Sequence, residues 1–304
     1  MILRLFHWAR LQMKRTKVAF SLAFGVPRVT HPAVFTAVTL GAGVQWHEAY
    51  DAVNQYDRMM VGGASLGGSV GAAGGWLQGG GHSALSPTYG LGMAISAVLL
   101  RCSCGYCGLG VDNAIEITVV TSTGEYLTVN DYQYSDLFWA LRGGGGGTYG
   151  IVTSVTYRTY ESLPVAFYTF QANVTNTTIM KELTARMLQF QTNLTDDGWG
   201  GYGGLTNTSI GFFAIAPNMS AEAANASTQP WIEYASSLQS QGVSSVAEIY
   251  LVPSWYELYT SIYNTSGGNG VDQMITSRLL SRDTIANRSR DVAEILVDCE
   301  AAFK

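Results

Sequence analysis

The sequence predicts an α+β protein with two domains, and three observations indicate this. Segments with strand patterns and segments with helix patterns come in separate runs along the 304 residues instead of alternating strictly. Hydrophobic residues make up 47% of the chain and charged residues 13%, a composition typical of a folded protein with a core. The composition also changes near Leu163-Pro164, so we place a boundary there. We expect a first domain at 37–162 and a second at 163–304, whereas residues 1–36 show no clear pattern.

The first domain is expected to consist mainly of short strands. Residues 37–46 predict a β-branched strand and a turn, and residues 47–56 predict a helix because their apolar positions recur at helical spacing. Residues 58–63 predict a short strand that ends in glycine. Two alternating segments surround Thr-Gly within 114–130, which predicts a β-hairpin. Residues 136–160 predict a helical turn, a loop of five glycines and a final strand.

The second domain is expected to mix strands with longer helices. In chain order, the periodicity predicts a strand at 167–174, a helix at 179–192, a hairpin at 199–216, and helices near 219–241, 253–263 and 284–300. No helix or strand is predicted between residues 241 and 253.

Charge and hydropathy exclude several classes of partner. The net charge is −5 and no long basic cluster follows Lys17, so we expect no nucleic acid as a partner. No apolar run reaches the ~18–20 residues of a membrane span, so we expect no insertion into a membrane. The cysteines at 102–107 have no second Cys/His cluster at zinc spacing, so we expect no metal.

Glycosylation sequons are concentrated in the second domain. The pattern Asn-x-Ser/Thr occurs at eight of the twelve asparagines: Asn173, Asn176, Asn193, Asn207, Asn218, Asn225, Asn264 and Asn287. Sequons mark exposed positions in secreted proteins, so we expect a secreted glycoprotein; chance in a Ser/Thr-rich half is the alternative. Residues 13–26 have the basic start and apolar run of a signal peptide, but they begin twelve residues into the chain and lack a clear cleavage site.

A serine in the first domain fits a hydrolase motif. Residues 63–67 match Gly-x-Ser-x-Gly, the nucleophile elbow of α/β-hydrolases, with Ser65 at its centre. Those enzymes need a histidine late in the chain to deprotonate the serine, and no histidine follows His82. A Ser65-centred hydrolase is therefore kept only as a second alternative.

Two glycine-rich loops, at 62–92 and 143–150, are the strongest functional signal in the sequence. Clustered glycines let backbone N–H groups come close to an anionic or planar ligand. Trp76, Leu77 and Leu85 stand among the glycines, which indicates an ordered, half-apolar pocket instead of mobile loops. No helix pattern is found within the first loop, so we expect no Rossmann fingerprint. A large dinucleotide with a pyrophosphate and a flat ring would use both loops.

A family resemblance supports this ligand. Residues 61–92 (VGGASLGGSVGAAGGWLQGGGHSALSPTYGLG), 111–130 and 136–155 resemble the p-cresol methylhydroxylase-type FAD domain of the vanillyl-alcohol-oxidase superfamily. The chain is most similar to berberine-bridge-enzyme-like oxidases, in particular to secreted fungal members of the isoamyl-alcohol-oxidase kind. The resemblance implies the second half of an FAD domain, followed by part of an α+β substrate domain with an antiparallel sheet and helices. It also implies a chain truncated at both ends.

The resemblance implies FAD as the cofactor and assigns its contacts. The implied residues are Val70, Gly71, Gly75, Trp76, Gly79, Gly80, His82, Ile151 and Val152. The histidine that bonds covalently to the flavin in the family has no counterpart here, and Gly67 stands where some relatives carry a second attachment cysteine. The catalytic base is unknown, and Tyr202 and Tyr256 are possible pocket residues.

The function that the resemblance implies is FAD-dependent oxidation of an alcohol or sugar-like hydroxyl of a small molecule, with O2 as electron acceptor. The alternative is a non-catalytic remnant, or a gene product with wrongly assigned exons, without a complete FAD site. Residues 93–110 interrupt the family pattern, and the Gly-Leu-Gly sequence stands on both sides of the interruption. We interpret these eighteen residues as a retained intron; a true loop insertion is the alternative.

Overall fold

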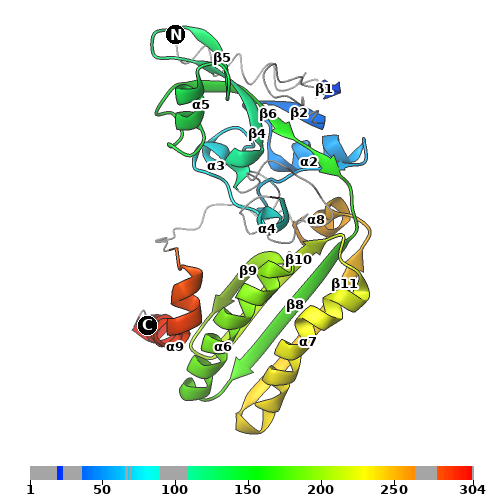
Figure 1. Ribbon diagram of the computed structural model, residues 1–304, viewed down its shortest axis with the longest axis vertical. Coiled ribbons are helices and arrows are strands. Elements are labelled where there is room, and N and C mark those ends of the chain that lie inside the picture. The colour runs from blue at the N-terminus through cyan, green and yellow to red at the C-terminus, as the bar shows by residue number, and fades with distance from the viewer. Residues whose placement is uncertain are drawn as a thin grey trace. The chain divides into compact units, whose positions relative to one another are not determined.

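A computed structural model describes residues 19–22, 36–65, 68, 70–89, 109–263 and 279–302 (Figure 1). The chain forms two compact units and passes from the first to the second between Leu163 and Pro164. From Ser254 it returns to the first unit, where the ring centroid of Tyr259 lies 4.6 Å from that of Tyr50. One helix of the expected second domain at 163–304 therefore packs with the first unit.

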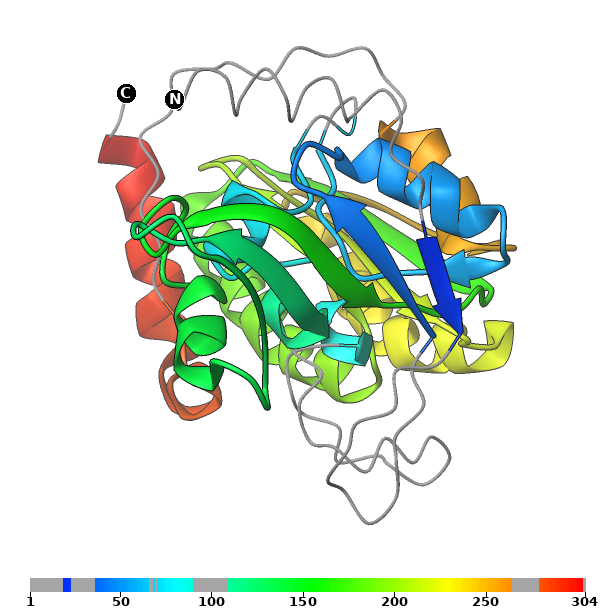
Figure 2. The same ribbon diagram turned by 90° about the horizontal axis from the view of Figure 1, so that it is seen from above.

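The first unit is built on a five-stranded antiparallel sheet with the order β1-β2-β6-β4-β5 (Figure 2). The strands are β1 (Ala19–Leu22), β2 (Thr36–Gly41), β4 (Ala114–Val120), β5 (Tyr126–Asn130) and β6 (Ile151–Arg158). β4 pairs with β5 around Gly124, whose φ is 85°, so the predicted hairpin is confirmed. β6 lies between β2 and β4, which places the strand after the second glycine loop in the middle of the sheet.

The helices of the first unit flank this sheet. α2 (Trp46–Asn54) confirms the helix predicted at 47–56, and the backbone N–H of Gln45 donates to the carboxylate of Glu48 at 2.9 Å, which caps its first turn. α5 (Ser135–Leu141) precedes the loop of five glycines, as predicted. α8 (Trp255–Tyr263) is the returning helix, and the two-residue strands β3 (Arg58–Met59) and β7 (Tyr160–Glu161) pair with each other.

Short helical turns lie within and next to the first glycine loop, where the sequence predicted none. They are α3 (Gly75–Gln78), α4 (Ser86–Tyr89) and the 3-10 turn η2 (Gly110–Asn113). A single turn has too few residues to show a period of 3.6, so the prediction failed for a physical reason. Leu77 and Gln78 of α3 are buried.

The second unit is a four-stranded antiparallel sheet with the order β11-β8-β10-β9 (Figure 1). Its strands are β8 (Val165–Val174), β9 (Gly200–Leu205), β10 (Ser209–Pro217) and β11 (Val243–Val252). Its helices are α6 (Thr177–Asp196), α7 (Ala221–Ser237) and α9 (Arg282–Ala302), with the 3-10 turn η3 (Gln239–Gln241). The predicted strand, hairpin and helices are confirmed, whereas β11 was not predicted.

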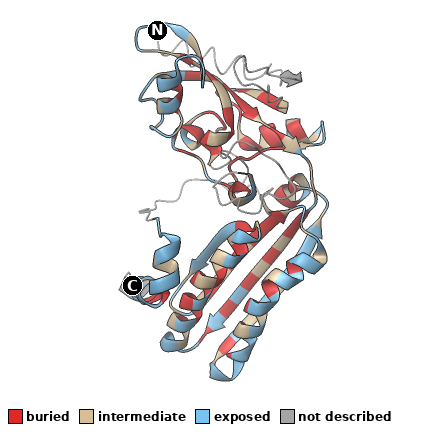
Figure 3. Cartoon of the chain, viewed as in Figure 1, coloured by how far each residue is buried: buried red, intermediate tan, exposed pale blue. Residues whose placement is uncertain are grey.

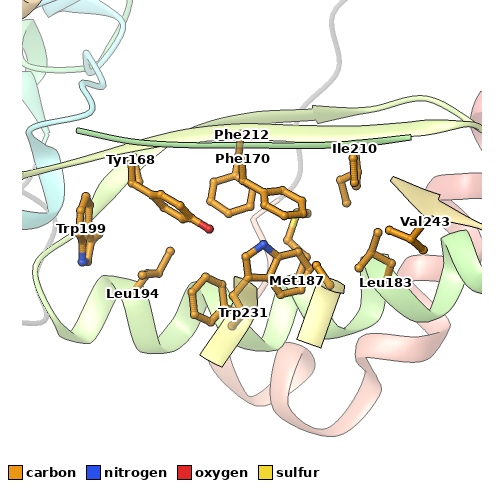
Figure 4. Close-up of a cluster of buried hydrophobic side chains, with 14 of the residues drawn as sticks. Tyr168, Phe170, Leu183, Met187, Leu194, Trp199, Ile210, Phe212, Trp231 and Val243 are labelled. Atoms are coloured by element: carbon orange, nitrogen blue, oxygen red, sulfur yellow. The ribbon is translucent and has the colours of Figure 1, made fainter. Parts of the chain in front are cut away.

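The core of the second unit lies between the sheet and helices α6 and α7 (Figure 4). Burial alternates along β8, so every second side chain points to the helices (Figure 3). Phe170 and Phe212 meet Trp231 of α7 there, and the Phe170 and Trp231 ring centroids are 5.1 Å apart. Tyr168 packs against Phe212. This aromatic core fixes which face of the sheet is covered.

Two kinds of feature are not found in the described part of the chain. No helix among these residues is long and apolar enough to cross a membrane. Within the same ranges, no group of three or more His, Cys, Asp or Glu side chains is placed to hold a metal ion. The cysteines at 102–107 lie outside the described residues.

Candidate functional site

The two glycine-rich loops lie together in the first unit, and Gln78 joins them. The backbone N–H of Gly145 donates to the carbonyl of Gln78 at 2.8 Å, and the N–H of Gly147 donates to Oε1 of the same residue at 3.3 Å. A Cβ built on Gly146 would lie 3.9 Å from the Cα of Gly75. Segments that the sequence separates by about seventy residues thus form one backbone surface.

Core side chains hold the carbonyl oxygens of the first loop. The pairs are Tyr50 Oη to Gly63 O at 3.0 Å, His47 Nδ1 with Gly68 O at 3.2 Å, Tyr157 Oη to Ala72 O, Gln78 Nε2 to Ala73 O at 3.2 Å, and Trp76 Nε1 to His82 O at 3.3 Å. Burial raises the pKa of Tyr157 well above its ordinary value, so its hydroxyl stays a neutral donor. Because the carbonyls are held from the core side, the loop can present N–H groups to a ligand.

The N–H groups of Gly74 and Gly75 are the accessible part of this surface. Neither donates a hydrogen bond to any described residue. Among the described residues, no atom lies within 4 Å of a Cβ built on Gly71, Gly74 or Gly75, so these residues leave the space beside them open. Backbone N–H groups beside open space suit an anionic or planar group that accepts hydrogen bonds at short range.

Other glycines, in the first loop and at the start of η2, serve internal packing. A Cβ on Gly81 would lie 2.8 Å from the ring of Trp76, and one on Gly110 would lie 2.2 Å from the same ring. A Cβ on Gly62 would lie 2.4 Å from the ring of Trp46. The two indoles are in edge contact, with centroids 4.7 Å apart and planes at 74°. These glycines are therefore explained by two buried or half-buried tryptophans without any ligand.

The predicted cofactor residues fall into two groups. Gly71 and Gly75 face space that no described residue fills, so their role in binding a cofactor stays a prediction. Trp76 turns inward to the packing described above, and a Cβ on Gly79 would lie 2.8 Å from the carbonyl oxygen of Gly75 in its own helix. Gly80 is buried with φ 110°, a conformation that favours glycine.

The remaining predicted residues lie at the margins of the loops. The carbonyl of Val70 accepts a hydrogen bond from the N–H of Trp46 at 3.0 Å, which ties it to α2. His82 is exposed, and its carbonyl accepts the Trp76 bond. Ile151 is exposed and Val152 is buried at the start of β6, directly after the second loop.

The geometry does not support the hydrolase alternative. The Ser65 hydroxyl is buried and has no hydrogen-bond partner among the described residues. His47 Nδ1 is engaged with the carbonyl of Gly68. A Ser-His pair, which the hydrolase mechanism requires, is not formed.

An aromatic row crosses the face of the second sheet opposite the helices. It consists of Tyr250, Phe167, Phe213 and Tyr202, one from each strand, with successive ring centroids 6.2, 6.0 and 5.7 Å apart. Tyr202 and Tyr250 are exposed, whereas Phe167 and Phe213 are half-buried. Tyr202 was predicted as a possible pocket residue, and no pattern in the sequence indicated the other three.

Tyr256, the other possible pocket residue, lies on the surface of the first unit. Its hydroxyl donates to the carboxylate of Asp51 on α2 at 2.8 Å, and this hydrogen bond raises the pKa of Tyr256. It therefore links α8 to α2.

Comparisons with known proteins find FAD-linked oxidoreductases among the similar sequences. An uncharacterised FAD-linked oxidoreductase of Arthroderma benhamiae is 32% identical over 268 residues, which cover 86% of this chain and 43% of that protein. The FAD-linked oxidoreductase phmC of Phaeosphaeria nodorum is 33% identical over 279 residues, or 89% of this chain and 56% of phmC. The chain thus spans about half the length of these relatives. No family model matches it.

Solved structures show the same fold. The VAO-type flavoprotein MtVAO615 of Myceliophthora thermophila is 27% identical, with a TM-score of 0.68 over 83% of this chain and 41% of that protein. MtVAO713 of the same organism is 22% identical, with a TM-score of 0.73 over 92% of this chain and 49% of that protein. The predicted fold class, part of an FAD-binding domain followed by an α+β domain, is confirmed.

Proposed function

We propose that this chain, a homologue of fungal FAD-linked oxidoreductases with the fold of VAO-type flavoproteins, binds FAD at the two glycine loops of its first unit. The reaction that we propose is oxidation of an alcohol or sugar-like hydroxyl of a small molecule, with O2 as the final electron acceptor. We assign no catalytic base among the described residues.

The open amide surface of the glycine loops carries this proposal. FAD combines an anionic pyrophosphate with a flat ring, and backbone without side chains can approach both closely. Gly74 and Gly75 offer N–H groups beside open space, and the second loop lies next to them at Gly146. These residues fit FAD. Bound FAD supplies the acceptor for a hydride, and the part of this chain is to bind and orient it.

Gly75→Val tests the placement of the cofactor. Because a Cβ at Gly75 meets no atom of a described residue within 4 Å, valine fits beside these residues but fills the space proposed for FAD. Fluorescence titration of the purified chain with FAD should show binding weakened about tenfold or more, with an unchanged thermal unfolding midpoint.

Gly204→Val is the matched control. Gly204 in β9 also has no atom of a described residue within 4 Å of a built Cβ, but it belongs to the second unit and not to the glycine loops. FAD affinity should be unchanged in this variant. Equal affinity in the Gly75 and Gly204 variants would contradict the proposed site. No FAD binding by the unaltered chain would favour the alternative, a non-catalytic chain without a complete FAD site.

The aromatic row supports a substrate with a ring. Aromatic faces stack on flat or weakly polar faces of a bound ring, and hydroxyl tips provide hydrogen bonds. Tyr250 and Tyr202 expose such tips at the two ends of the row, and Tyr250 Oη donates to the Glu248 carboxylate at 2.6 Å. We place the alcohol or sugar-like substrate on this face of the second sheet.

Secretion with N-linked glycans is also part of the proposal. Six sequon asparagines are exposed: Asn173, Asn176, Asn193, Asn218, Asn225 and Asn287. Asn207 is half-buried in the turn between β9 and β10, and Asn264 lies outside the described residues. Exposure is what glycosylation requires, so the second unit supports the expectation of a secreted glycoprotein.

A further inference from the structure

Gln78 combines burial with polarity at the junction of the two glycine loops. It lies in α3, and its side chain is long and polar although the residue is only 5% exposed. Such a residue is seldom buried unless its amide is hydrogen-bonded. Both ends of this amide are paired: Nε2 donates to the carbonyl of Ala73 at 3.2 Å, and Oε1 accepts from the N–H of Gly147 at 3.3 Å. One side chain therefore connects the two loops.

The backbone hydrogen bond at Gly145 brings the loops together without fixing the N–H of Gly147. The bond from the N–H of Gly145 to the carbonyl of Gln78 involves no side chain. Gly147 has φ 74°, and a Cβ there would meet no atom within 4 Å in the described ranges, so none of these residues packs against its Cβ side. The Gln78 amide is the contact found for the N–H of Gly147 in the described part of the chain.

We infer that Gln78 is a positioning residue. It aligns the backbone amides of residues 143–147, in the second loop, with those of Gly74 and Gly75, so that one ligand meets both loops. The inference rests on the proposed function, because FAD is the ligand concerned. Both ends of the Gln78 amide are used within the protein, so this side chain acts on the ligand only through the backbone that it holds.

Gln78→Met tests the connection without any ligand. Methionine keeps the length and most of the volume of the side chain but can form neither hydrogen bond. Hydrogen exchange of the full chain, followed by mass spectrometry, should show exchange in peptides covering 143–147 about tenfold faster, with the second unit unchanged. Gln189→Met is the matched control: Gln189 is a half-buried glutamine of the second unit that donates to Ser289 at 2.9 Å. It should leave exchange at 143–147 unchanged.

Gln78→Glu gives a second test through pH. A protonated glutamic acid can donate to Ala73 and accept from Gly147, as glutamine does, whereas the carboxylate repels the Ala73 carbonyl. Burial favours the protonated form, so the variant should recover exchange protection as the pH falls toward about 5. FAD affinity, compared with that of the unaltered chain at each pH, should recover in parallel. A merely volume-filling role would not produce this recovery.

The outcomes separate this inference from the proposed function. Unchanged exchange at 143–147 in Gln78→Met overturns the inference. If methionine prevents folding, absence of recovery in Gln78→Glu at low pH overturns it. Faster exchange together with weakened FAD binding supports both proposals. If exchange is faster in Gln78→Met but the unaltered chain binds no FAD, the connection between the loops is retained and FAD is rejected as the ligand.

Discussion

Glycine is used for different physical reasons within a few residues of the first loop. Gly75 stands beside open space, where a side chain would exclude a ligand. Gly110 and Gly81 make room for the indole of Trp76, and Gly80 takes a backbone conformation with φ 110°. The sequence shows all four as the same residue, so only the surroundings tell a binding glycine from a packing glycine.

Gly110→Ala should destabilise the first unit by overpacking. The added Cβ would lie 2.2 Å from the ring of Trp76, too close for two carbon atoms, so the indole or η2 must move. We expect a loss of about 1–3 kcal/mol in the free energy of unfolding, measured by urea denaturation. Gly204→Ala, at an open position, should cost much less.

Trp76→Phe tests the cause of this loss. The smaller ring should recover part of the stability lost in Gly110→Ala, so the double variant should be more stable than the sum of the two single effects predicts. Additive effects would show that Trp76 is not the neighbour that demands glycine at position 110.

Helix α6 shows how one residue can serve an element and a modification together. Asn176 caps the helix: its Oδ1 accepts from the N–H groups of Thr178 at 2.8 Å and Ile179 at 3.4 Å. The same asparagine begins a sequon, and its side chain is exposed.

Strand β11 carries apolar residues on both of its faces, because Val246 and Tyr250 lie on the face opposite Ala247 and Ile249. As an edge strand with apolar residues on both faces, it lacks a clear alternation, which explains why it was not predicted.

Asn176→Asp should separate the cap from the sequon. Aspartate is as good a helix cap as asparagine, so stability should be retained, whereas Asn176→Ala should lose about 1 kcal/mol. The glycan mass is the difference between the intact masses before and after enzymatic deglycosylation of protein secreted from a glycosylating host. In both variants this difference should be smaller by one glycan than in the unaltered protein. An unchanged mass difference in both would mean that Asn176 carries no glycan.

Residues 93–110, which we interpret as an insert, interrupt the sequence pattern of the first unit. The last two of these residues nevertheless pack in that unit: the N–H of Gly110 donates to the carbonyl of Gly81 at 2.7 Å. Gly-Leu-Gly occurs at 90–92 and again at 108–110, so deleting 93–110 or 90–107 gives the same protein. After such a deletion, the Gly-Leu-Gly at 90–92 can therefore take the place of the one at 108–110 in the contact with Gly81.

Deletion of residues 93–110 should leave a folded chain. Shortening a loop changes its closure entropy by only about 0.6 kcal/mol per doubling of length, so the unfolding midpoint should be equal or slightly higher. FAD affinity should not fall. A deleted chain that fails to fold would show a true structural insertion. Sequencing of transcripts gives an independent check, since reads spliced between Gly92 and Val111 are expected if the segment is an intron.

Local chemistry was enough to predict the elements whose stability depends on neighbours in the chain. Alternation around a Thr-Gly turn predicted the hairpin β4–β5, and helical spacing predicted α2 and α6. The resemblance of the glycine motifs was enough to predict that the chain is similar to FAD-linked oxidoreductases and VAO-type flavoproteins. Periodicity and turn residues act over a few positions, so they can be read along the sequence.

Tertiary contacts decided what depends on residues far apart in the chain. They pair Gln78 with Gly147, bring α8 back to the first unit, and turn Trp76 against Gly110 so that only part of the glycine run faces open space. No local pattern marks a buried amide that joins two loops, because its partner in the second loop, Gly147, lies 69 residues away. Burial and hydrogen bonding of that kind are properties of the packed chain, and folding alone brings such partners into contact.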